Sequence, residues 1–156
     1  MDQSYGIHYI VDFDTDKTEL LENAGIMRFL LVSLLHDHGY TILKTEHHQF
    51  SPYGASVTCI LCESHASIHT WPENGFCSFD LYTCDKNKDP YATGRKLMRM
   101  LDAIRIRAEY IIERGIDRFG FIDDMINNSI ALGSNIAPII EGMRHAGLNI
   151  EPIKIT

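Results

Sequence analysis

Hydrophobic positions near the start of the chain change from a two-residue to a three-to-four-residue repeat. Apolar and polar side chains alternate loosely over residues 6–13, which predicts a half-buried strand. From Thr18 onward the repeat has the spacing of an amphipathic helix that packs on a flat surface. The apolar stripe of this helix consists of Leu20, Ala24, Met27, Leu31 and Leu34. Its expected left-handed stop is Gly39, and its candidate N-caps are Asp14, Thr15 and Asp16.

The middle of the chain is typical of strands separated by turn-forming residues. Residues 40–50, 55–62 and 76–84 are rich in aliphatic and aromatic side chains, which favours strands. The segment 51–54 contains proline and glycine and predicts a turn. Residues 64–75 are expected to form a strand-to-strand connection, where a rigid sheet can hold reactive groups.

A second helix and a last strand complete the predicted fold. Asp89 and Pro90 indicate a helix start, because an N-cap is followed by proline at the first helical position. The expected buried stripe of this helix is Leu97, Leu101 and Ile104, and residues 110–112 predict a final strand. The order of elements predicts an α+β fold, a two-layer α/β sandwich with helices on one face of a mainly antiparallel sheet.

The length fits one compact domain, and its last quarter has the weakest pattern. A chain of 156 residues, 45% of them hydrophobic, can bury a sizeable core but leaves no room for a second full domain, so we expect a single domain over residues 1–156. Short helices are predicted at 121–128 and 135–145. Residues 115–156 form a carboxy-terminal extension that could cover a site, extend a dimer contact or bind an effector, and the sequence does not choose among these.

Charge, hydropathy and cysteine content narrow the cellular setting. A net charge of −7 argues against a general nucleic-acid binder, which needs clustered Lys and Arg, and suits a cationic small molecule. The sequence has no apolar run of about 18 residues and no basic, apolar leader, so we expect no membrane partner and a cytoplasmic location. The four cysteines are expected to be free thiols.

The stretch from Glu63 to Cys84 carries the groups of a self-generated electrophile. Ser64 directly follows the Glu63 carbonyl, His69 lies five residues further on as a proton-transfer group, and Cys84 offers a thiol that can protonate a carbanion. Taken singly, these residues have ordinary structural explanations as a turn serine, a packing histidine and a buried strand cysteine. The specific signal is the combination: a Glu-Ser-His triplet followed by Ile-His-Thr-Trp-Pro-Glu over residues 68–73.

This segment resembles the bacterial S-adenosylmethionine decarboxylases, pyruvoyl enzymes that are made as self-cleaving proenzymes. The similarity spans residues 5–114 and is dense over 52–84. It implies that the Ser64 hydroxyl attacks the Glu63 carbonyl, that the peptide becomes an ester, and that elimination and hydrolysis leave a pyruvoyl group and ammonia. This autocatalytic cleavage would produce two chains, 1–63 and 64–156.

The resemblance also implies roles for three residues near that bond. His69 matches the family's processing histidine, which moves a proton during elimination, and Ser56 matches its second processing serine. Alternation along a flat strand places Ser56 and Ser64 on one face, but a bend near Cys62 would change this, so periodicity does not decide whether they meet. Cys84 would protonate the carbanion after the pyruvoyl carbonyl has formed a Schiff base with the substrate amine and accepted the electrons left by carbon dioxide.

The implied substrate, S-adenosylmethionine, calls for further groups. Its adenine, ribose diol and sulfonium cation need an aromatic platform, a carboxylate acceptor and a π face or acid. Phe50, Trp71 and Glu73 supply these groups in the matching region. His8 resembles a family position near the amino terminus, although Ile7 stands where an arginine often precedes it. The expected function is that of a carboxy-lyase producing the aminopropyl donor of spermidine biosynthesis, in a homodimer of cleaved protomers with sites near the subunit interface.

Other interpretations stay open at this point. The same pyruvoyl chemistry could act on a basic amino acid such as ornithine or arginine, or the chain could be a regulatory homologue that does not process itself. A zinc site has suitable ligand types in Cys59, Cys62, His65 and His69. Residues three apart on a strand point to opposite faces, however, so we expect no metal there. The sequence does not report whether putrescine or a metal activates the enzyme.

Overall fold

The computed structural model describes residues 5–115 of the chain. By its internal contacts the chain divides into two units, Met1–Ile116 and Asp117–Thr156, and the second lies outside the described residues. The helices expected at 121–128 and 135–145 also lie outside them. Those helices, and the single domain expected over residues 1–156, therefore stay predictions.

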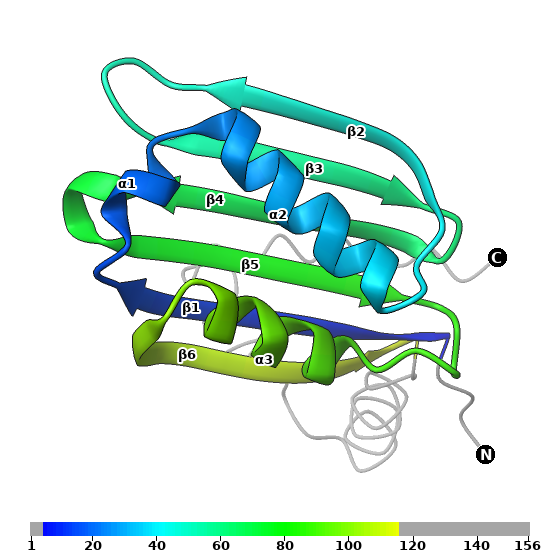
Figure 1. Cartoon of the computed structure of the whole chain (residues 1–156). Coiled ribbons are helices and arrows are strands. Elements are labelled where there is room, and N and C mark those ends of the chain that lie inside the picture. The colour runs from blue at the N-terminus through cyan, green and yellow to red at the C-terminus, as the bar shows by residue number, and fades with distance from the viewer. Residues whose placement is uncertain (1–4, 116–156) are drawn as a thin grey trace, which may run out of the picture. The chain divides into compact units, whose positions relative to one another are not determined.

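The described residues form one antiparallel sheet with two longer helices packed on one of its faces (Figure 1). In chain order the elements are β1 (Gly6–Thr15), α1 (Thr18–Leu21), α2 (Ala24–Asp37), β2 (Ile42–Gln49), β3 (Ala55–Leu61), β4 (Ser64–Trp71), the 3₁₀ turn η1 (Pro72–Asn74), β5 (Phe76–Thr83), α3 (Pro90–Met100) and β6 (Ala103–Arg114). The strand order is β2-β3-β4-β5-β1-β6, and each neighbouring pair is antiparallel. The predicted α+β sandwich is confirmed.

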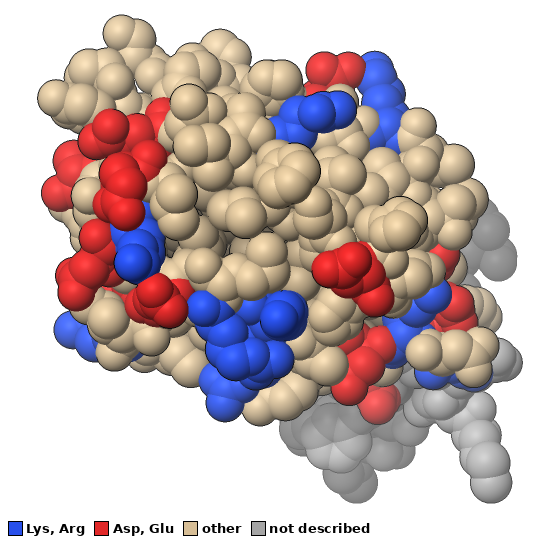
Figure 2. All heavy atoms as spheres, in the orientation of Figure 1, with Lys and Arg blue, Asp and Glu red and all other residues tan. Residues whose placement is uncertain are grey.

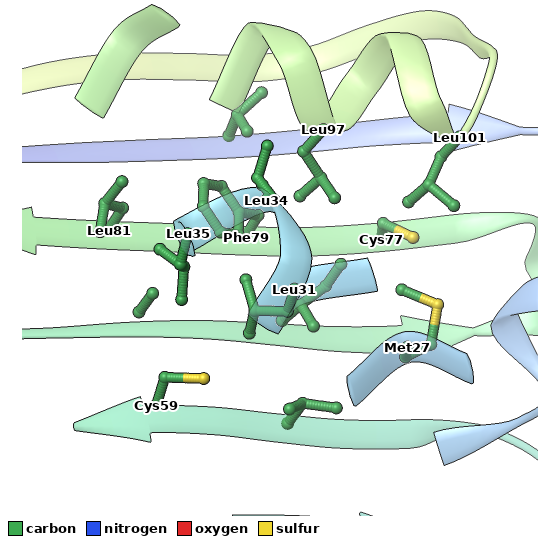
Figure 3. Packing of buried hydrophobic residues seen from close by; sticks show 14 of the residues in the cluster. Met27, Leu31, Leu34, Leu35, Cys59, Cys77, Phe79, Leu81, Leu97 and Leu101 are labelled. Atoms are coloured by element: carbon green, nitrogen blue, oxygen red, sulfur yellow. The ribbon is translucent and has the colours of Figure 1, made fainter. Parts of the chain in front are cut away.

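The core lies between the helices and the sheet face that they cover (Figure 3). Alternate residues of the central strands point into it, among them Val57 of β3, Ile68 of β4 and Phe79 of β5, each of which is completely buried. They meet Leu31 of α2 and Leu97 of α3, which are buried as well. This alternation leaves the other side chains of the same strands on the opposite face of the sheet.

That opposite face, which no described helix covers, is called the open face below. Strand pairing aligns its side chains in rows across β3, β4 and β5. The rows are Ser56, His69 and Ser78; then Thr58, Ser67 and Asp80; then Ile60, His65 and Tyr82. His8 of β1 extends the third row, because it pairs with Tyr82. The open face is thus rich in polar side chains, while the covered face is apolar.

The helix predicted from Thr18 is interrupted, and its predicted N-caps are wrong. Asp14 and Thr15 belong to β1, and the short α1 begins after Lys17 without a side-chain cap. The longer α2 is capped by Asn23, whose side chain accepts a hydrogen bond from the Ile26 amide, 3.0 Å away. The Ala24 amide donates to the Gln49 side chain of β2 at 2.8 Å, so a distant strand satisfies a helix-end donor. The predicted stop at Gly39 is confirmed by its φ of 73°.

The second helix begins as predicted but ends earlier. The Asp89 side chain caps α3 by accepting from the Ala92 amide at 2.9 Å, and Pro90 follows it. Leu97 and Leu101 are buried, whereas the expected third member of the stripe, Ile104, lies in β6 and is 62% exposed. Pairing with the whole length of β1 extends β6 far beyond the residues 110–112 predicted as strand.

The expected connection over 64–75 is also different from what the sequence suggests. Residues Ser64–Trp71 form β4, a central strand that pairs with β5 along its whole length and with β3 from Ser64 to His69. Only η1 and Gly75 connect β4 to β5. Ser64 therefore lies at the beginning of a strand, directly after the tight turn that joins β3 to β4.

Charged side chains on the helix-covered face form small groups of both signs (Figure 2). One pair of opposite charges is formed by Lys17 and Asp102, whose charged atoms are 3.4 Å apart. On that face the described Lys and Arg side chains do not form a continuous basic surface. Within residues 5–115, no helix has the length and apolar character needed to cross a bilayer.

Candidate active site

Ser64 occupies a strained position at the start of β4. Its φ is 145°, a region that costs non-glycine residues about 1–3 kcal/mol. The strand register places it opposite Leu61 of β3 and Thr83 of β5, so its neighbours on both sides are fixed. Such strain persists only where the surrounding structure enforces it, and it is typical of functional sites. The predicted scissile bond is thus held in an unusual conformation by two flanking strands.

Glu63 is held through both its backbone and its side chain. Its carbonyl oxygen accepts a hydrogen bond from the Cys84 amide at 2.9 Å. Its carboxylate accepts from the Thr41 amide, with both oxygens within 3.3 Å. A backbone N–H aimed at a carbonyl stabilises the negative charge that forms there on nucleophilic attack. The carbonyl expected to be attacked therefore has an oxyanion donor in place.

Cys84 lies next to this bond because β5 ends beside the beginning of β4. Thr83, the residue before it, pairs with Ser64. The thiol is free and exposed. Glu63, Ser64 and Cys84 form one group of predicted site residues, called the cleavage end below.

The remaining predicted residues gather at the other end of the same strands. The Ser56 hydroxyl and the His69 Nδ1 are 2.7 Å apart, which is hydrogen-bond distance. The Trp71 ring centroid lies 6.5 Å from that of His69 and 5.1 Å from that of Phe76. Phe50 directly follows β2 and contacts His48, which pairs with Ser56. Exposed Glu73 lies in η1, shortly after Trp71. The group of predicted residues at this end is called the histidine end below and consists of Phe50, Ser56, His69, Trp71 and Glu73.

The two ends are separated along β4. His69 is five residues from Ser64 on the same strand, roughly 17 Å at about 3.4 Å per residue. The pairing of Ser56 with His69 settles the question that alternation left open, because it puts Ser56 at the histidine end and away from Ser64. Within this chain the predicted residues therefore form two separate groups, which are called the half-sites below.

The cleavage end contains a polar cluster that the predicted site does not include. Asp80 Oδ2 lies 3.2 Å from His8 Nε2 and 3.4 Å from His65 Nε2. Its other oxygen, Oδ1, accepts a hydrogen bond from the Ser67 hydroxyl. The His65 Nδ1 in turn lies 3.2 Å from the Ser64 hydroxyl. Asp80 is not among the site residues predicted from the sequence. The sequence does contain a signal for it, because Asp80 is the one charged residue in the β5 sequence Phe-Cys-Ser-Phe-Asp-Leu-Tyr-Thr.

The ligand atoms of His8, His65 and Asp80 are close enough together to hold a metal ion, all within 4.8 Å of one another. The hydrogen bonds of His8 argue against a metal ion at this position. Arg114 donates to His8 Nδ1 at 3.1 Å, so the neutral His8 ring carries its proton on Nε2 and directs it at Asp80. Of the two cysteines considered as zinc ligands, Cys59 is buried in the core and Cys62 is exposed, and the absence of a zinc site there stays a prediction.

Comparisons with known proteins show which family the chain belongs to. Residues 7–115 match the sequence profile of the family described as S-adenosylmethionine decarboxylase. The chain is 35% identical over 124 residues to the S-adenosylmethionine decarboxylase proenzyme of Thermotoga petrophila, covering 78% of this chain and 94% of that protein. It is 33% identical over 120 residues to the proenzyme of the same name from Brevibacillus brevis, covering 77% and 90%.

A solved structure is similar as well. The crystal structure of the adenosylmethionine decarboxylase from Aquifex aeolicus superposes with a TM-score of 0.68 at 31% sequence identity, over 73% of this chain and 93% of that one. The family profile, the two relatives and the solved structure therefore all match the part of the chain that contains both half-sites. The chain belongs to the S-adenosylmethionine decarboxylase family, a family of carboxy-lyases.

Proposed function

We propose that this protein decarboxylates S-adenosylmethionine after cutting its own backbone between Glu63 and Ser64. The observation that carries the proposal is the state of that bond: a serine with a φ of 145° follows a carbonyl that accepts from the Cys84 amide at 2.9 Å. Attack by the serine oxygen would relieve the strained backbone, and the amide N–H would stabilise the developing oxyanion. Family membership supplies the substrate class, and the aminopropyl product would serve spermidine synthesis.

The second step of processing needs a base for the Ser64 Cα proton. By resemblance this base is His69, and its contact with Ser56 supports the assignment because the hydroxyl orients the ring. A residue roughly 17 Å from Ser64 along the same strand cannot act within its own protomer. We therefore propose a homodimer in which the histidine end of one protomer meets the cleavage end of its partner. A two-fold axis would generate two such sites, since each contact occurs twice.

The residues present fit the pyruvoyl group that processing would leave at position 64. This group would supply the electron sink for decarboxylation. Cys84 would donate a proton to the substrate carbon, as its exposed position beside Ser64 allows. Phe50 and Trp71, exposed by 48% and 41%, would offer stacking surfaces for adenine or the sulfonium, and Glu73 would accept from the ribose hydroxyls.

Intact-mass analysis of the purified full chain tests the cleavage. We expect two chains that break before Ser64, with a blocked amino terminus on the second. The Ser64→Ala variant should stay whole, because it has no nucleophile at that bond. The matched control is Ser33→Ala in α2, which should split like the wild type. A Ser64→Ala protein that still splits at this position would show that the nucleophile is wrongly assigned.

Carbon dioxide release from candidate substrates tests the second half of the proposal. Cleaved protein should release it from S-adenosylmethionine, and Trp71→Ala should raise KM because a stacking surface is lost. Release from ornithine or arginine instead would assign the same cleavage chemistry to a basic amino acid. A whole chain without turnover would favour a regulatory homologue.

A further inference from the structure

We infer that Asp80, His65 and Ser64 form a proton relay in which His65 is the base for the first step of self-cleavage. This inference deepens the proposed function and rests on it. It concerns the transfer of the acyl group from the Ser64 nitrogen to the Ser64 oxygen, which precedes any elimination. The relay lies within one protomer, unlike the proposed pairing of Ser64 with His69 of the partner.

His65 lies between the Asp80 carboxylate and the proposed nucleophile, the Ser64 hydroxyl. Its Nδ1 is 3.2 Å from the Ser64 hydroxyl oxygen, and its Nε2 is 3.4 Å from Asp80 Oδ2. A base of this kind must lie within hydrogen-bond reach of the proton that it removes, and such contacts are often long before the reacting state forms. The order carboxylate, imidazole, hydroxyl is the arrangement that activates a serine in hydrolases.

The surroundings select the tautomer that the reaction needs. Asp80 accepts from Ser67 through Oδ1 and presents Oδ2 to the two imidazoles. A carboxylate facing Nε2 of His65 favours a proton on that nitrogen, which leaves Nδ1 with a lone pair directed at Ser64. His8 receives a hydrogen bond from Arg114 on its Nδ1, so it also directs an N–H at Asp80. The carboxylate is thus shared by two N–H donors.

Ring contacts hold His65 in this orientation. Its centroid lies 5.9 Å from the Tyr82 ring and 6.0 Å from the His8 ring, the latter in an edge-on arrangement. The side chains of His65 and Asp80 are 43% and 28% exposed, so the relay is open to small solutes. That access makes chemical rescue a practical test.

The proposed step is an isomerisation that needs no further reactant. The Ser64 hydroxyl proton moves to His65 Nδ1 as the oxygen forms a bond to the Glu63 carbonyl carbon. The Cys84 amide stabilises the resulting oxyanion. Collapse of this intermediate breaks the carbon–nitrogen bond, and His65 returns the proton to the leaving nitrogen. The products are an ester at the Ser64 oxygen and a free amine, with all atoms and electrons retained.

The test isolates this step in a full chain that carries His69→Ala. In this variant the ester should persist, because the base proposed for elimination is missing. Hydroxylamine attacks the ester, so it should split the chain after residue 63 at a rate set by ester formation. Adding His65→Gln should slow this splitting roughly 100-fold, the usual contribution of a general base. Adding Asp80→Asn should slow it too, because an amide can donate to Nε2 and favour the wrong tautomer. Adding His47→Gln, on the other face of the edge strand β2, should change nothing.

Chemical rescue separates a base from a structural residue. Splitting of the His65→Ala, His69→Ala chain should recover with added imidazole, which a purely structural role for His65 would not allow. If the His65 variants split at the parent rate while the wild type cleaves normally, the relay is wrong and the proposed function stands. Slow splitting without rescue by imidazole also overturns the relay. If the wild type never cleaves, the proposed function fails and the relay fails with it.

Discussion

At the scale of single residues, chemistry depends on which face of the sheet a side chain occupies. Cys77 and Cys59 point into the core and are completely buried, whereas Cys84 and Cys62 are exposed. Burial raises the pKa of the Cys77 thiol to about 12, with a smaller contribution from the carboxylate of Asp14. Burial also raises the pKa of Cys59, against a hydrogen bond from Thr45 that lowers it. The four cysteines thus divide into two exposed and two buried thiols.

Alkylation of the native protein at pH 8 checks this division. We expect Cys62 and Cys84 to react and Cys59 and Cys77 to stay unmodified, because the thiolate is the reactive form and the buried thiols remain protonated. Raising the pH should reach Cys77 only near its pKa of about 12 or once the protein unfolds. Peptide mapping by mass spectrometry measures the modified sites, and denatured protein, in which all four thiols should react, is the control. Rapid labelling of Cys77 in folded protein would contradict the burial described.

At the scale of elements, helix α3 packs on the sheet at a point where no side chain fits. A Cβ added to Gly94 would lie 2.0 Å from Cε1 of Tyr9, whose ring is completely buried in β1. The Tyr9 hydroxyl donates to Glu109 of β6 at 2.6 Å, and Arg95 of α3 lies 3.7 Å from the same carboxylate. This network fixes the ring, so Tyr9 cannot move aside for a larger residue.

Gly94→Ala should therefore destabilise the protein, although alanine favours helices. We expect the free energy of unfolding to fall by about 1–3 kcal/mol, the usual cost of overpacking a core. Urea denaturation followed by circular dichroism measures the change. The matched control is Gly25→Ala in the first turn of α2, where the nearest atom to an added Cβ is the Asn23 side chain at 3.1 Å. The control meets only the far end of the exposed Asn23 side chain, the cap of α2, so it should lose clearly less stability than Gly94→Ala. Equal effects in both variants would contradict the close contact.

At the scale of the whole molecule, the separation of the two half-sites is the central fact. Ser64 and His69 belong to one strand, yet they lie at its opposite ends. Ser56 and His69 of one half-site lie on the open face, which no described helix covers (Figure 1), and Ser64 of the other half-site begins the same strand as His69. A second copy related by a two-fold axis would complete each site without any change in the protomer.

Complementation between two inactive variants tests this dimer. Ser64→Ala and His69→Ala copies with different tags should each stay uncut alone. When they are co-expressed, the His69→Ala copy should be cut, because its Ser64 meets the His69 of the other copy. The control replaces the first copy with a Ser64→Ala, His69→Ala double variant and should give no cutting. Intact mass identifies which copy has split, and mixed dimers without cutting would place the whole site in one protomer.

The features that could be predicted from the amino-acid sequence are local ones. Alternation and helical spacing placed most elements, the Asp-Pro pair located the start of α3, and Gly39 marked the end of α2. The Glu-Ser-His and Ile-His-Thr-Trp-Pro-Glu segments indicated the family and the candidate reacting groups. These signals work because propensity, capping and motif chemistry act over a few neighbouring residues. Asp80 could have been proposed as a candidate in the same way, because it is the one charged residue of β5.

How these elements and residues come together depends on contacts between distant parts of the chain. The break in the first helix depends on Gln49 from a distant strand, and the length of β6 depends on its pairing with β1. The predicted connection after Ser64 is a strand because β3 and β5 flank it on both sides. Register likewise put Ser56 beside His69 and Asp80 beside His65. Strand pairing joins residues far apart in sequence, so no local pattern records it.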